Sequence, residues 1–328
     1  MLSRVANSIY WMSRYIERAE NVARFIEVNL HLMLDRPAGA EHSEQWGPLV
    51  STTGDLDPFR EKYGETATKE NVLQFLTFDK SNPNSILSTL TRARENARTI
   101  RETITSEMWE QINKFYFFVK EAAFGDAATD TPQDFYMKVK MESHLYAGIA
   151  DATMNRGEDW HFARMGKLIE RADKTSRIID VKYFLLLPKP EDVGTPIDNI
   201  QWAALLKSAS ALDMYRRKFD YISPERVADF LILDRSFPRA ILFCIMVAED
   251  SLHAITGSPI DGYQNEAERR MGLLHSELVY ASIDEIIDIG LHEYLDAFQT
   301  RLNRVDDAIR SSFFSMEPVK AKGGGAAQ

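Results

Sequence analysis

Cysteine and long apolar runs are both scarce in this chain of 328 residues. The single cysteine, Cys244, cannot form a disulfide within the chain, which fits a reducing compartment. It lies in the run AILFCIMVA (Ala240–Ala248), a setting typical of a buried and inert thiol. Nine apolar residues are far fewer than the roughly 18 that a membrane span needs, so we expect no membrane segment.

Positive charge is also in short supply. The chain has 39 Lys and Arg against 49 Asp and Glu, a formal net charge of −10. A general nucleic-acid-binding protein needs a basic face to displace counterions, so the composition argues against that class while leaving room for a local basic site. Glu17 and Glu20 come early and no small-residue cleavage site follows, so we expect no secretory signal and a cytoplasmic protein.

Familiar catalytic patterns are missing too. The sequence has no phosphate-cradling glycine loop, no G-x-S-x-G nucleophile elbow and no Cys/His spacing that suggests zinc. Glu158 and His161 have the Glu-x-x-His spacing of dimetal sites in helical bundles, and Asp250 and His253 have the same spacing with aspartate in place of glutamate. Neither pair has a counterpart elsewhere in the chain, so we predict no metal and no other cofactor.

What the chain does contain is a repeat of its opening helix. Met12–Leu34 reads MSRYIERAENVARFIEVNLHLML, and Met165–Leu187, 153 positions later, reads MGKLIERADKTSRIIDVKYFLLL. Apolar residues recur in steps of three and four along both segments, the period of one helix face packed on another helix. The identical pairs include Met12/Met165, Ile16/Ile169, Glu17/Glu170, Arg18/Arg171, Ala19/Ala172, Arg24/Arg177, Ile26/Ile179 and Val28/Val181.

The repeat continues beyond this helix. VLQFLTFDKSNPNSIL (Val72–Leu87) matches VADFLILDRSFPRAIL (Val227–Leu242) at an offset of 155. No convincing run of alternating β-branched residues interrupts the helical pattern. We therefore predict an all-α protein formed by tandem duplication of a helical-bundle unit. The copies cover about 1–152 and 153–316, and 317–328 is expected to be a flexible tail.

Prolines mark several expected helix boundaries. The two repeated helices should end before Pro37 and Pro188, and Pro83 and Pro238 fit the first turn of a helix. The helix after Pro238 is apolar nearly all round and should be central in its bundle. Its counterpart, expected from about Pro83 to Glu107, is far more polar, so the two copies have diverged there.

The repeated Glu-Arg residues allow two interpretations. On a solvated face, Glu17→Ala would cost at most about 1 kcal/mol of stability. In a buried pair, for example across a pseudo-two-fold axis between the copies, it would cost roughly 3–5 kcal/mol. Ordinary exposed positions drift between copies, as Asn21 does to Lys174, whereas these residues recur. Structural ion pairs are therefore favoured, and a ligand or partner site is the alternative.

A second basic group lies on the polar helix. Arg92, Arg94, Arg98 and Arg101 share one or two adjacent helix faces with Asn96. Guanidinium groups could grip a carboxylate or phosphate there. A solvated helix balanced by neighbouring glutamates is the favoured interpretation.

Together these segments resemble the bacterial alpha-E domain family. The resemblance rests on the opening MLSRVANSIYWMSRYIERAENVAR, the second IERAD, the stretch Ser81–Glu110 and FLILDRSFPRA (Phe230–Ala240), and it runs from residue 1 to about 310. It departs at Ala240, where a serine is expected. The motif positions that the resemblance carries over are Glu17, Arg18, Arg24, Arg94, Asn96, Arg98, Glu170, Arg171, Arg177, Asp234 and Arg239.

The resemblance implies an all-helical protein encoded near a circularly permuted ATP-grasp ligase and a transglutaminase-like cysteine peptidase, sometimes with a proteasome-like peptidase. Our leading hypothesis is a non-catalytic accessory subunit of such a peptide synthesis, tagging or processing system, with an acidic docking surface and an arginine-lined site for a peptide carboxylate. One alternative is a helical-bundle enzyme, a hydrolase, ligase component or metal enzyme, that uses Glu17 and Glu170 or the Glu158–His161 pair. Another is a purely structural homo-oligomer.

Overall fold

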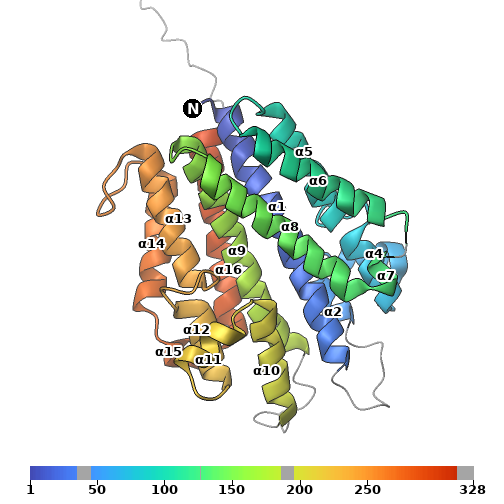
Figure 1. The fold of residues 1–328 in the computed structure, drawn as a ribbon. Coiled ribbons are helices and arrows are strands. Elements are labelled where there is room, and N and C mark those ends of the chain that lie inside the picture. The colour runs from blue at the N-terminus through green and yellow to red at the C-terminus, as the bar shows by residue number, and fades with distance from the viewer. Residues whose placement is uncertain (35–45, 126, 186–195, 316–328) are drawn as a thin grey trace, which may run out of the picture.

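The computed structural model describes residues 1–34, 46–125, 127–185 and 196–315, and every regular element in these ranges is helical (Figure 1). The expected stops at Pro37 and Pro188 and the expected tail at 317–328 lie outside the described residues. The helices are α1 (Ser3–Leu34), α2 (Trp46–Thr53), α3 (Leu56–Tyr63), α4 (Lys69–Thr77), α5 (Ile86–Thr99), α6 (Ser106–Ala122), α7 (Ala127–Asp130), α8 (Pro132–Thr153), α9 (Glu158–Leu185), α10 (Pro196–Ser208), α11 (Leu212–Lys218), α12 (Pro224–Leu233), α13 (Ile241–Thr256), α14 (Glu266–Tyr280), α15 (Ile283–Ile289) and α16 (Leu291–Ile309), followed by a π-helical turn, Arg310–Phe314.

Helices α1 and α9, which carry the repeated segments, pack against each other at the centre of the molecule (Figure 1). Helices α5 and α8 pack on α1, and α13 and α16 pack on α9. Helix α2 also packs on α9, and α10 also packs on α1, so the elements that follow each central helix are not confined to one side of the pair. No helix in the described part of the chain is both long and apolar enough to cross a membrane.

The central helices approach each other closely. A Cβ atom added at Gly166 of α9 would lie 2.5 Å from the carbonyl oxygen of Tyr10 in α1, so only glycine fits at this crossing. The apolar stripe predicted on α1 is buried: Ile9, Met12 and Ala19 have no exposed surface. Neighbouring elements also cover the opposite face of α1, so the charged residues Glu17, Glu20 and Arg24 are buried as well.

The prediction that the helix after Pro238 is central in the second half is confirmed. Helix α13 is buried along most of its length and contains Cys244, which is fully buried and whose thiol donates to Pro238 O at 3.5 Å. Burial raises the pKa of this thiol to about 12, which fits the expected inert cysteine.

Two predictions about the polar counterpart were wrong. The single helix expected from Pro83 to Glu107 is two helices, because the chain turns after Thr99 and Thr105 begins α6 by accepting a hydrogen bond from Met108 N. Pro83 also lies in the turn before its helix rather than in the first helical turn, since α5 begins after the cap residue Ser85.

Pro238 behaves in the same way, because α13 begins only at Ile241. Asp234 caps this preceding turn: its Oδ1 accepts from the amides of Ser236 and Phe237, both at 2.8 Å. Lys218 Nζ donates to the other oxygen of Asp234 at 2.8 Å. These contacts hold the pKa of Asp234 down at about 2 although burial opposes them, so this motif residue organises a turn.

Candidate functional site

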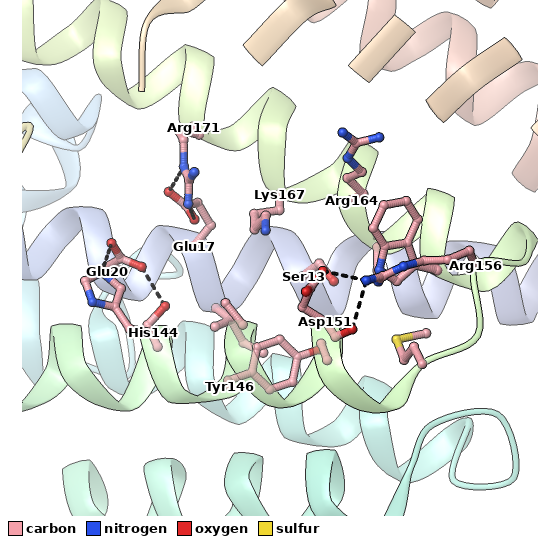
Figure 2. A pocket seen from close by; sticks show the side chains of 17 residues that line it. Ser13, Glu17, Glu20, His144, Tyr146, Asp151, Arg156, Arg164, Lys167 and Arg171 are labelled. Atoms are coloured by element: carbon pink, nitrogen blue, oxygen red, sulfur yellow. Dashed lines mark hydrogen bonds and ion pairs between the residues drawn. The ribbon is translucent and has the colours of Figure 1, made fainter. Parts of the chain in front are cut away.

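The two Glu-Arg motifs pair with each other across the central helices. Arg18 of α1 donates from Nε and Nη2 to the two carboxylate oxygens of Glu170 in α9, at 2.6 and 2.9 Å. Arg171 of α9 donates in the same way to the two oxygens of Glu17 in α1, at 2.9 and 2.8 Å (Figure 2). Each bond pair is a bidentate fork, the strongest geometry for an arginine and a carboxylate. The motif therefore joins the first half of the chain to the second.

Three more motif residues extend the network around α1. Arg239, which precedes α13, donates to Glu17 Oε1 at 3.2 Å and makes a short contact with Glu20. Arg24 donates to Glu20 Oε1 from Nε at 2.9 Å and from Nη2 at 2.7 Å. Arg177 of α9 pairs with Asp173 at 3.1 Å, one turn along from Glu170. Both Glu20–Arg24 and Asp173–Arg177 are pairs at i and i+4 on one helix, the first buried and the second partly buried.

Burial decides how much these pairs matter. Glu170 is fully buried and Glu17 is 2% exposed, so the interpretation of a solvated face is wrong for both. Burial alone would raise the pKa of Glu170, but Arg18, Lys174 and Arg14 outweigh it and hold that pKa well below its usual range. Removing one partner of such a pair leaves a buried charge without compensation, which is far more costly than losing a surface pair.

The structure separates the remaining nominated residues from this network. Arg94, Asn96 and Arg98 lie on the outer part of α5. Arg94 donates to Asn113 at 2.7 Å and lies over aromatic rings of α6, with its guanidinium carbon 5.1 Å from the centre of the Tyr116 ring. Arg98 is exposed and pairs with Glu95 at 2.7 Å, as the solvated-helix interpretation expected.

Sequence reasoning missed Arg14, which occupies the same network. Its Nε donates to Glu170 at 2.9 Å and its Nη1 to Asp306 of α16 at 2.5 Å. The residue 153 positions later is Lys167, also basic. A search for repeated charge rather than repeated identity would have found this position.

A cavity of about 360 Å³ lies beside the network, between α1, α8 and α9 (Figure 2). Glu17 and Glu20 of α1 line one end, Arg156 and Trp160 line the other, and Lys167 lies between them (Figure 2). Apolar lining comes from Ile16, Ala147, Ala150, Met154 and Ala163. This volume lies within the usual range of small-molecule pockets, roughly 300–1,000 Å³.

The residues named for an enzyme have other partners. Arginines engage the carboxylates of both Glu17 and Glu170, as described above. Glu158 is about half exposed at the start of α9, and the pKa of its spacing partner His161 is lowered by burial and by Arg164. Among the described residues, no three His, Cys, Asp or Glu side chains lie close enough together to hold a metal ion.

Comparison with known proteins identifies the family. A family model described as a predicted alpha-helical domain with a conserved ER motif matches residues 1–314, so the chain belongs to the Alpha-E family. It is also similar to uncharacterized proteins of Mycobacterium bovis and of two strains of Mycobacterium tuberculosis. Each match is 21% identical and covers 94% of this chain but 36% of the relative, so the chain spans just over a third of the length of these relatives. No solved structure matches the chain significantly.

Proposed function

We propose that this Alpha-E domain is a non-catalytic accessory subunit of a cytoplasmic system for peptide synthesis, tagging or processing. Its partners in the proposal are a circularly permuted ATP-grasp ligase and a transglutaminase-like cysteine peptidase, with a proteasome-like peptidase as a further candidate. Membership of the family supports the proposal, because these are the partners that the resemblance implies. The net charge of −10 supports an acidic docking surface.

The observation that carries the proposal is the state of the ER motif. Its two glutamates are buried, and each accepts a bidentate bond from the arginine of the other motif. A carboxylate held ionised in this way is a poor general acid or base, because its pKa lies far from neutral pH. The motif is therefore assigned to scaffold, and binding is assigned to the cavity beside it and to the outer surface.

The proposal also treats the chain as two tandem copies, 1–152 and 153–316. The offset of 153–155 residues in the sequence supports this, as does the reciprocal pairing of Glu17 with Arg171 and of Glu170 with Arg18. In this scheme each copy supplies one glutamate and one arginine to a joint between the copies.

The test is a pull-down from extract of the source cells, with retained proteins identified by mass spectrometry. Wild type should retain the ATP-grasp ligase or the peptidase. The variant Arg94→Ala/Arg98→Ala, which strips two arginines from the outer part of α5, should lose the partner while remaining folded. The matched control is Arg269→Ala/Arg270→Ala, which removes two partly exposed arginines that both pair with Glu266 on α14.

Two outcomes would contradict parts of the proposal. A wild-type chain that retains neither enzyme, and that runs as a defined oligomer by light scattering, would favour the structural homo-oligomer instead. Equal loss of the partner in both double variants would remove α5 as the contact, because the effect would then follow total charge rather than position.

A further inference from the structure

Two regions, which we call corners, flank the crossing of α1 and α9. The closed corner borders α16, and the open corner borders α8. In the closed corner, formed by Tyr10, Arg14 and Asp306, every polar group has a partner. Tyr10 Oη donates to Asp306 Oδ1 at 2.5 Å, and Arg14 bridges Asp306 and Glu170. The Tyr10 ring is fully buried and lies 5.4 Å from the ring of Phe314. Side chains therefore fill this corner.

Offset 153 places Ala163 and Lys167 of the open corner at the positions of Tyr10 and Arg14. Asp151 of α8 is the acidic residue near the open corner, as Asp306 of α16 is in the closed one. An alanine stands where the other corner has a tyrosine ring, which leaves space unfilled. The space is the cavity between α1, α8 and α9.

In the open corner, Lys167 lacks the acidic partner that Arg14 has in Asp306 of the closed corner. Asp151 pairs instead with Arg156 at 2.9 Å, at an exposed position. Glu17 and Glu20 are engaged by Arg171, Arg239 and Arg24, as described above. Lys167 makes no hydrogen bond or ion pair with any residue that the structure describes, although its side chain is largely buried and its amine is directed into the cavity (Figure 2). Burial, and then the charge of Arg171, lowers the pKa of this amine.

The rest of the cavity suits the body of a ligand that carries an acid group. Trp160 forms a flat apolar wall, and the Arg156 guanidinium carbon lies 4.3 Å from its ring centre. Arg156 is half exposed and its Asp151 partner is more exposed still, so that pair is weak and can exchange. Arg164 also lines the cavity and lies over the Trp160 ring, with its guanidinium carbon 5.0 Å from the ring centre, while Figure 2 shows its guanidinium directed away from Lys167. Lys167 is the cation whose amine is directed toward the middle of the cavity (Figure 2).

We propose that the open corner binds the terminal carboxylate of a short peptide whose last residue is apolar or aromatic, and this inference rests on the proposed function. Lys167 Nζ is the counter-ion of the carboxylate, and Arg156 is its second donor. The apolar side chain of the ligand lies against Trp160 and Met154. Because Glu17 and Glu20 also line the cavity, its balance of charge suits the single charge of a carboxylate better than the charge of about −1.5 to −2 on a phosphoryl group.

The test is isothermal titration calorimetry with N-acetyl-alanyl-phenylalanine. Its C-terminal amide is the matched neutral probe, and inorganic phosphate is the second anion. The acid should bind at least about tenfold more tightly than the amide and than phosphate, because only the acid supplies one negative charge together with an apolar body. Lys167→Met should weaken binding of the acid by about tenfold or more and leave the affinity for the amide unchanged. Lys167→Arg should retain most of the wild-type affinity for the acid.

A second variant tests the cavity itself. Ala163→Phe puts a ring where the closed corner has Tyr10, and it should abolish binding while the protein stays folded by circular dichroism. Arg269→Met, on α14, which contributes no residue to the cavity lining, should bind like wild type. The inference is overturned if the acid and the amide bind equally, if folded Lys167→Met keeps its affinity, if phosphate binds better than the acid, or if wild type gives no heat with the acid at millimolar concentration.

This experiment and the pull-down can fail separately. Carboxylate binding without a captured enzyme would contradict the accessory role and support the carboxylate site. A captured ATP-grasp ligase without carboxylate binding would support the accessory role and contradict the carboxylate site.

Discussion

The closed and open corners lie beside the same pair of helices and share the same Glu-Arg pairing, yet they differ in two side chains and in the partner of an aspartate. Tyr10, Arg14 and Asp306 fill one corner and bond to one another. In the other, Asp151 pairs with Arg156, and Ala163 and Lys167 leave a cavity and an amine with no partner among the described residues. The pairing is therefore common to both sides, and what differs is the group that occupies the space next to it. This separates a structural task, which both corners perform, from the binding task that we propose for the open corner.

The largest expected effect tests what the corners share. Glu17→Ala would remove the carboxylate partner of Arg171 and one of the two that Arg239 has, and Glu170→Ala would do the same to Arg18 and Arg14. We expect each variant to lose roughly 3–5 kcal/mol of unfolding free energy in urea, because each leaves a largely buried arginine without its carboxylate. Glu266→Ala, on an exposed pair of α14, should show no measurable change. Losses near 1 kcal/mol for Glu17→Ala would mean that the motif is not structural.

A smaller effect tests the crossing that separates the corners. Gly166→Ala would place a Cβ against the backbone oxygen of Tyr10, and backbone yields less easily than a flexible side chain. We expect a loss of about 1–3 kcal/mol from overpacking. Gly148→Ala, at an exposed helical glycine with no atom within 4 Å of the new Cβ, should instead gain about 0.5–1 kcal/mol. Thermal melts that rank these two glycines in the opposite order would contradict the close approach.

The smallest expected effect is the response to acid. The pKa of Glu170 is lowered on folding, so this carboxylate contributes stability above its unfolded pKa of about 4.3, and the contribution is lost as pH falls through its folded pKa. Glu20 should behave similarly. Burial raises its pKa, but the larger combined effect of Arg239, His144 and Arg24 lowers that pKa below its usual value. Unfolding free energy should therefore fall steadily below about pH 4, and less steeply in Glu170→Gln. Equal slopes for wild type and Glu170→Gln would exclude Glu170 as a source of this dependence.

Much of the fold could be predicted from the sequence. Apolar residues spaced three and four positions apart predicted the long helices α1 and α9, and the run around Cys244 predicted that α13 is buried. These predictions succeeded because helix periodicity and apolar runs are local properties. The boundary between α5 and α6 was missed, because Ile100–Ile104 looks helical and the cap at Thr105 gives the only local signal.

The site was harder to predict, for a physical reason. Repetition of Glu17 and Arg18 at offset 153 marked them as unusual, and a buried pair between the copies was among the hypotheses. Whether a charged helix face is buried depends on which neighbours cover it, and the α1 sequence alone does not contain that information. Lys167 was overlooked because its significance is the lack of a partner, which only the packing of α8 and α9 determines.

The comparison between the corners can be tested directly by measuring the unfolding free energies of Arg14→Met and Lys167→Met side by side. Arg14→Met removes the only cation that pairs with Asp306 among the described residues, leaving it the Tyr10 hydroxyl, and takes one donor from Glu170, so we expect a loss of roughly 3 kcal/mol. Lys167→Met removes a largely buried amine that has no partner among the described residues, so stability should be unchanged or slightly higher. Equal losses in the two variants would mean that Lys167 is as structural as Arg14 and would contradict the account of an open binding corner.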